Sequence, residues 1–134
     1  MTKDTTADFS QFLLSPTGRV EINLPNGDPM MVDGKRVAIN VYSPASAEHA
    51  RASAAVQRAA RDKLLGGKKS ANEADESAEI DARFLTTVTE SIENFPYPGG
   101  AHAIYRERGL LYIGEQVRTY LNDQGNFFGK SKAS

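Results

Sequence analysis

The stretch RVEINLPNGD, residues 19–28, decides the fold at the start of the chain. Val20, Ile22 and Leu24 alternate with polar side chains, which places the three apolar ones on one face of a predicted β-strand. Asn26-Gly27 follows, and this dipeptide accepts the positive φ angles of a tight turn. The stretch therefore predicts the first strand of an antiparallel hairpin.

A second alternating run, VAINVY at residues 37–42, supplies the partner strand. Val37, Ile39 and Val41 share one face of it, and Asp33-Gly34 is a further turn signal before it begins. Two strands alone are marginally stable in water, so other elements must cover their apolar face. The remaining chain is expected to supply helices for this purpose.

Strong helix formers dominate residues 47–65 and predict a first long helix, with Ser46 as its N-cap. Gly66-Gly67 is expected to end this helix by taking the left-handed conformation. Residues 66–70 then form an exposed, mobile connection. The stripe expected to face the core repeats every four residues, at Ala52, Val56, Ala60 and Leu64.

A second long helix is predicted over residues 72–94, and Pro96 and Pro98 stop it. Two shorter helices are expected over residues 101–108 and 110–122. The expected fold class is α+β and mainly α, with an N-terminal β-hairpin, an antiparallel pair of long helices and two shorter C-terminal helices. The apolar side chains of the second long helix are spaced for one face, at Ala74, Ala78, Leu85, Val88, Ile92 and Phe95.

The length of 134 residues corresponds to one domain. We expect a flexible N-terminus at residues 1–10, a single domain at 11–128 and a disordered tail at 129–134. The polar start lacks the apolar segment of a secretory signal, and the apolar runs are too short for a membrane helix. A soluble cytoplasmic protein is therefore expected.

The composition argues against several classes of function. Sixteen basic and seventeen acidic residues give a net charge of -1, so no global field attracts nucleic acid or membrane. The absence of cysteine excludes disulfides, thiolate metal sites and thiol nucleophiles. The two histidines, His49 and His102, lack a metal-ligand partner at helical spacing. We predict no catalytic residue, no metal and no cofactor.

The segment Gly66-Gly67-Lys68-Lys69-Ser70 superficially suggests a phosphate-binding loop. The motif requires a glycine at the position of Asp62 and a Ser or Thr at the position of Lys69. The segment also follows a predicted helix, whereas a phosphate-binding loop follows a strand. A basic linker is the better interpretation.

Charge is distributed unevenly between the two long helices. Residues 49–69 carry a basic excess that includes Arg51, Arg58 and Arg61, whereas residues 70–93 are mainly acidic. In one interpretation, opposite charges face each other in a helical hairpin. Exposed pairs contribute only about 0–1 kcal/mol each, so they would set orientation more than stability. In the other, the basic helix contacts an acidic partner or nucleic acid.

Aromatic side chains concentrate after residue 80. Phe84 and Phe95 are expected in the core, whereas Tyr97 and the pair Phe127-Phe128 are expected to be partly exposed. Exposed aromatic residues are typical interface anchors, although packing inside the domain is the alternative for each of them. The candidate partner-binding residues are Phe95, Tyr97, Tyr105, Tyr112, Tyr120, Phe127 and Phe128.

The order of these elements resembles the tail assembly chaperones of tailed bacteriophages. The resemblance covers residues 12–128 and lies in the order of short motifs. The early ones are Phe12-Leu13-Leu14-Ser15-Pro16-Thr17-Gly18, the strand Val20-Glu21-Ile22-Asn23-Leu24-Pro25-Asn26-Gly27, and Val41-Tyr42-Ser43-Pro44-Ala45-Ser46. The late ones are Phe84-Leu85, Glu93-Asn94-Phe95, Ala103-Ile104-Tyr105, Tyr112-Ile113-Gly114-Glu115-Gln116-Val117 and Asn126-Phe127-Phe128.

The resemblance implies a non-enzymatic protein that binds and solubilises the tape measure protein and helps to recruit tail tube subunits. It also implies self-association, a location in the host bacterial cytoplasm during assembly, and absence from the mature virion. Two other classes stay open. One is a small nucleic-acid-binding regulator that uses Arg51, Arg58 and Arg61, and the other is a structural tail or connector component.

Overall fold

The computed structural model describes residues 9–66 and 73–128 and has an α+β fold. A three-stranded antiparallel sheet has the order β1-β4-β5, formed by Thr17–Glu21, Ala38–Tyr42 and Thr89–Glu93. The four α-helices within these ranges are α1 (Ala47–Gly66), α2 (Glu73–Val88), α3 (Gly100–Arg106) and α4 (Leu111–Leu121). The expected mobile connection at 66–70 falls largely outside the described residues, as do the expected flexible start up to residue 8 and the expected tail at 129–134.

The predicted pairing of the two N-terminal strands is confirmed. β1 runs antiparallel to β4, with Val20 opposite Ile39, and the backbone bond from Ile22 N–H to the Val37 carbonyl, 3.1 Å, extends the pairing. The intervening residues form a small second hairpin of β2 (Met31–Val32) and β3 (Lys35–Arg36). Gly27 and Gly34 both have positive φ, as their turns require.

The prediction of a single helix over residues 72–94 is wrong beyond Val88. The chain leaves α2 there and continues as β5, which pairs antiparallel with β4 and places Ile92 opposite Ile39. The Thr86 hydroxyl donates to the Ala82 carbonyl at 2.6 Å, and the Thr89 hydroxyl donates to the Leu85 carbonyl at 2.8 Å. The second bond satisfies a carbonyl of the last helical turn.

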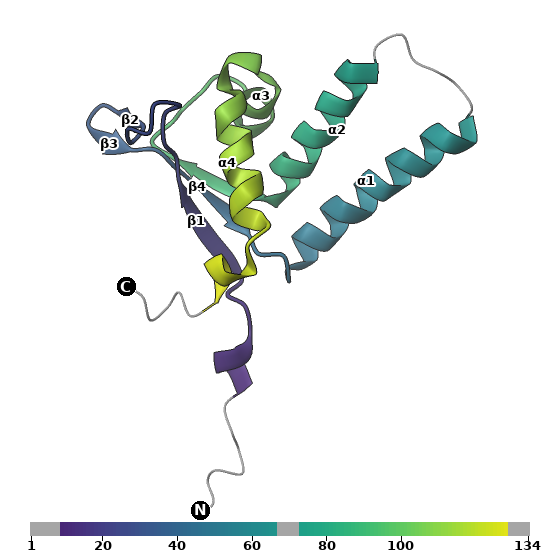
Figure 1. Ribbon diagram of the computed structural model, residues 1–134, viewed down its shortest axis with the longest axis horizontal. Coiled ribbons are helices and arrows are strands. Elements are labelled where there is room, and N and C mark those ends of the chain that lie inside the picture. The colour runs from purple at the N-terminus through teal and green to yellow at the C-terminus, as the bar shows by residue number, and fades with distance from the viewer. Residues whose placement is uncertain (1–8, 67–72, 129–134) are drawn as a thin grey trace, which may run out of the picture.

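The core lies between the sheet and the helices, and α4 crosses the sheet in Figure 1. Phe127, in the short 3-10 helix η4 (Gln124–Phe127), is completely buried and closes one end of this core. The other face of the sheet is polar: Arg19 and Asn40 both hydrogen-bond to Glu93 there, and Arg19 also bonds to Glu21. The buried apolar side chains that form the core include Val20, Ile22, Val37, Ile39, Val41, Leu85, Val88, Ile104, Ile113, Val117 and Leu121.

Helices α1 and α2 run antiparallel and extend away from the sheet (Figure 1). Ser46 caps α1 as predicted, because its hydroxyl accepts the His49 N–H at 3.0 Å. The predicted core stripe of α1 is correct only near the sheet. Ala52 is buried, but Ala60 is exposed and Leu64 is 83% exposed. The end of the helix lies beyond the core that would have covered it.

Candidate partner-binding groove

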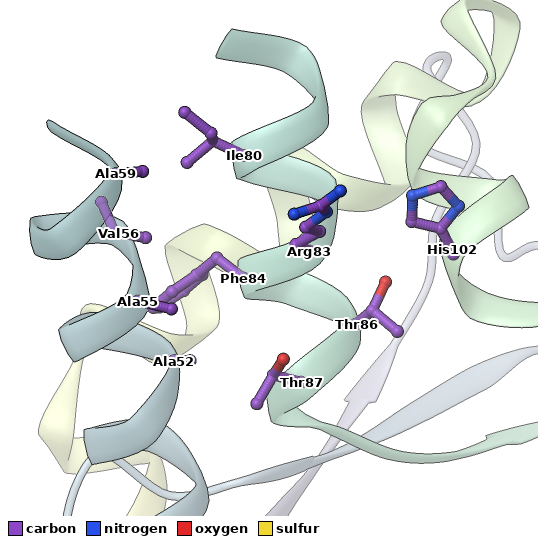
Figure 2. Close-up of a pocket in the computed structure, with 10 residues that line it drawn as sticks. All are labelled: Ala52, Ala55, Val56, Ala59, Ile80, Arg83, Phe84, Thr86, Thr87 and His102. Carbon is purple, nitrogen blue, oxygen red and sulfur yellow. The ribbon is translucent and has the colours of Figure 1, made fainter. Parts of the chain in front are cut away.

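An apolar groove lies along α1 and α2, and its lining continues across α2 to His102 of α3 (Figure 2). Its volume is about 290 Å³, at the lower limit of the range for small-molecule sites. We call it the α1–α2 groove. Its lining residues are Ala52, Ala55, Val56 and Ala59 of α1, Ile80, Arg83, Phe84, Thr86 and Thr87 of α2, and His102 of α3.

The groove exists because α1 presents small side chains to α2. Ala52, Ala55 and Ala59 follow one another at spacings of three and four residues and so share one side of the helix. Ile80 and Phe84 point toward α1 from the opposite wall (Figure 2). Phe84, Ile80 and Val56 are partly exposed, so apolar surface remains in contact with solvent along the groove.

Phe84 is held in place from two sides. The His49 ring contacts it edge-on, with the ring centroids 5.5 Å apart. The guanidinium of Arg118 lies 5.5 Å from the centroid of the same ring, a cation–π arrangement. Burial lowers the pKa of His49, which favours its neutral form at this contact. The wall of the groove is therefore preformed.

Three carboxylates of α2, those of Asp75, Glu79 and Asp81, are engaged by α3 and α4. Glu79 lies 2.7 Å from Arg83 and 3.1 Å from His102. Its hydrogen bonds hold the pKa of Glu79 below the usual value, and the bond from Arg83 has the larger effect. Arg106 of α3 pairs with Asp75 at 2.7 Å, and Arg118 of α4 lies 3.5 Å from Asp81. The acidic face of α2 is thus turned toward the C-terminal helices.

Of the two interpretations of the charge distribution, the one in which opposite charges pair across the helical hairpin is therefore mostly wrong. Across residues 9–66 and 73–128, Lys63–Glu73 at 3.8 Å is the one ion pair that joins α1 to α2. Arg51, Arg58 and Arg61 are exposed and make no ion pair with any described residue. The sequence could not show this, because α3 and α4 compete for the same carboxylates from distant positions in the chain.

The candidate aromatic residues lie elsewhere, and none of them lines the α1–α2 groove. Phe95 and Tyr97 stack on each other with centroids 5.6 Å apart and pack partly against the core. The Tyr105 hydroxyl lies 2.6 Å from the Thr89 hydroxyl, and burial raises the pKa of Tyr105 to about 12. Tyr112 is also partly buried against the core.

The expectation that Phe127 is partly exposed is wrong, and the alternative, packing inside the domain, holds for this residue. Its ring is completely buried and meets Tyr120 edge-on, with centroids 5.2 Å apart. The Ser15 N–H donates to the Phe127 carbonyl at 2.6 Å, which fixes the C-terminal segment beside the start of β1. Phe128 is 48% exposed, so of this pair only Phe128 offers side-chain surface to a partner.

Sequence reasoning missed the groove itself. The apolar spacing through Ala52 and Val56 indicated the side of α1 that faces α2, but it predicted that this side is buried along the whole helix. The available signal was the size of the side chains, because alanines at three of the lining positions leave space that larger residues would fill. The adjacent leucines, Leu64 and Leu65, are 83% and 79% exposed and also mark this helix as incompletely covered.

The described residues contain no group of three or more His, Asp or Glu side chains placed to hold a metal ion. Within residues 9–66 and 73–128, every helix is too short or too polar to span a membrane. No protein-family profile matches this chain, and no characterised protein or solved structure is significantly similar to it.

Proposed function

We propose that this chain is a tail assembly chaperone of a tailed bacteriophage, and that it holds an apolar helical segment of the tape measure protein in the α1–α2 groove. The observation that carries the proposal is the groove itself, with Val56, Ile80 and Phe84 partly exposed between two helices that extend away from the core. A partner helix laid there would bury apolar surface that otherwise favours aggregation. The order of the sequence motifs supports the same function.

Co-expression with the tape measure protein of the same phage tests the proposal. We expect the tape measure protein to be soluble with the wild-type chain and insoluble without it. Ala55→Trp should abolish the effect, because the indole would fill the groove from an exposed position on its lining. Ala54→Trp is the matched control, since Ala54 is an exposed alanine on the same helix that does not line the groove. Equal solubility with and without the chain would disprove the chaperone role.

A structural tail or connector component is the competing assignment, and purified particles separate the two. A chaperone leaves before assembly is complete, so mass spectrometry of finished virions should find tube and tape measure peptides but none from this chain. A fixed stoichiometric amount of the chain in virions would instead identify a structural component.

A further inference from the structure

We infer that the α1–α2 groove selects an acidic amphipathic helix, whose carboxylates pair with Arg51 and Arg58. This inference rests on the proposed function and names the chemistry of the segment that is bound. It follows from two features of the groove: small side chains that admit another helix, and a charge pattern that one class of helix would complement.

The shape of the groove fits a helix. Ala52 and Ala59 are seven residues apart, so the alanine side of α1 extends over about two helical turns. Alanine allows close approach of helix axes, and Phe84 and Ile80 on the facing wall provide the larger contacts. An apolar stripe at positions i, i+3 or i+4, and i+7 of a partner helix would match this length.

The α1 edge of the groove carries two arginines, Arg51 in the first turns of the helix and Arg58 near its middle. Arg51 lies four residues before Ala55 and Arg58 lies three residues after it, so both share its side of the helix. Both arginines are exposed and have no ion-pair partner within residues 9–66 and 73–128. A carboxylate on the partner could reach them without breaking an existing pair there.

The α2 residues that line the groove, Ile80, Arg83, Phe84, Thr86 and Thr87, include no carboxylate. Glu79 is already engaged by Arg83, His102 and Arg106. Exposed acidic side chains occur toward the far end of the groove, at Asp62 on α1 and at Glu76 on α2. Carboxylates of a partner helix could therefore meet Arg51 and Arg58 without competition from the α2 wall.

Two synthetic peptides of about 18 residues, long enough to be helical, test the selection. Both carry leucines at positions i, i+3 or i+4, and i+7. One peptide has glutamates beside this leucine stripe, and the other has lysines at the same positions. We expect fluorescence anisotropy at low salt to show about tenfold tighter binding of the glutamate peptide. The double variant R51E/R58E should reverse this preference, because both edge charges change sign.

Arg61→Glu is the matched control for Arg58→Glu. Arg61 lies nine residues after the buried Ala52, about two and a half turns, and so projects from the opposite side of α1. Arg61→Glu should leave both peptide affinities unchanged, whereas Arg58→Glu should weaken binding of the glutamate peptide severalfold. Equal effects of the two single variants would overturn the inference, as would equal affinity of the wild-type chain for both peptides, or binding of neither.

Two other occupants would also give definite results. A salt-sensitive shift of duplex DNA that depends on Arg51 and Arg58, without a preference for the glutamate peptide, would assign this edge to nucleic acid. A change of oligomeric state in Ala55→Trp, measured by sedimentation, would assign the groove to a second copy of the chain.

If R51E/R58E still solubilises the tape measure protein fully, the inference fails but the chaperone function stands. If the glutamate peptide is selected but the tape measure protein stays insoluble, the chaperone function fails.

Discussion

At the scale of single residues, Gly18 is a position where close packing leaves no room for a side chain. A Cβ atom at Gly18 would lie 2.7 Å from the Tyr120 hydroxyl and 2.8 Å from a ring carbon of Phe127, which is itself completely buried. Gly18→Ala should therefore lower the free energy of unfolding by about 1–3 kcal/mol, as measured by urea denaturation. Gly66→Ala is the control, because nothing lies within 4 Å of that Cβ position. Equal midpoints for wild type and Gly18→Ala would show that the Tyr120 and Phe127 rings move aside easily.

His49 gives the fold a pH dependence in a defined direction. Burial lowers the pKa of His49 below the usual 6.5, so the unfolded chain takes up this proton at a higher pH than the folded chain does. The contribution of His49 is fully present above about pH 6.5 and is lost as the pH falls from there through the folded-state pKa. We expect His49→Gln to flatten the dependence of stability on pH between about 7 and 5, measured by urea denaturation at each pH. An identical slope in the two proteins would contradict this assignment, because every other titrating group is common to both.

At the scale of elements, local sequence was sufficient for the first hairpin and insufficient for the third strand. Alternation and turn residues act over a few positions, so β1, β4 and the turn at Gly27 were predictable. The spacing of Leu85, Val88 and Ile92 fits a helix, although the last of these lies in β5. The deciding interactions come from residues far away in the chain, since Asn40 donates to the Ser91 hydroxyl at 3.0 Å and to Glu93 at 2.8 Å. Tertiary pairing thus overrides the local preference.

The candidate site shows the same limit at the level of whole helices. The helices α1 and α2 and the uneven charge between them could be read from the sequence. The groove could not be read from the sequence, because it depends on how far the core extends beneath α1. Ala52 is covered by the rest of the fold and Leu64 is not, yet both belong to one apolar stripe. Likewise, Asp75 and Glu79 are paired by α3, which leaves the basic edge of α1 available to a partner.

At the scale of the whole molecule, the structure divides into a densely packed part and a projecting part. The buried side chains gather around β4, α4 and the end of α2, whereas the second half of α1, from Ala60 onward, is exposed. Local opening costs least where few apolar contacts must break, so this half of α1 should open without unfolding the sheet. This half of α1 begins directly after the groove and carries the exposed apolar side chains of Leu64 and Leu65.

Hydrogen exchange measures this division directly. Amides at 60–65 should exchange at least about 100-fold faster than those of Ile39 to Val41, after correction for intrinsic rates. The comparison within helices is sharper, because α4 has buried Ile113, Val117 and Leu121 along its length and should be protected almost as well as β4. Fast exchange in α1 with slow exchange in α4 would show that neither helix length nor backbone hydrogen bonding explains the difference in exchange rate, because α1 is the longer helix. Equal protection of α1 and α4 would instead mean that α1 opens only when the core unfolds. Binding of a partner would then add no local stability to α1 beyond its direct contacts.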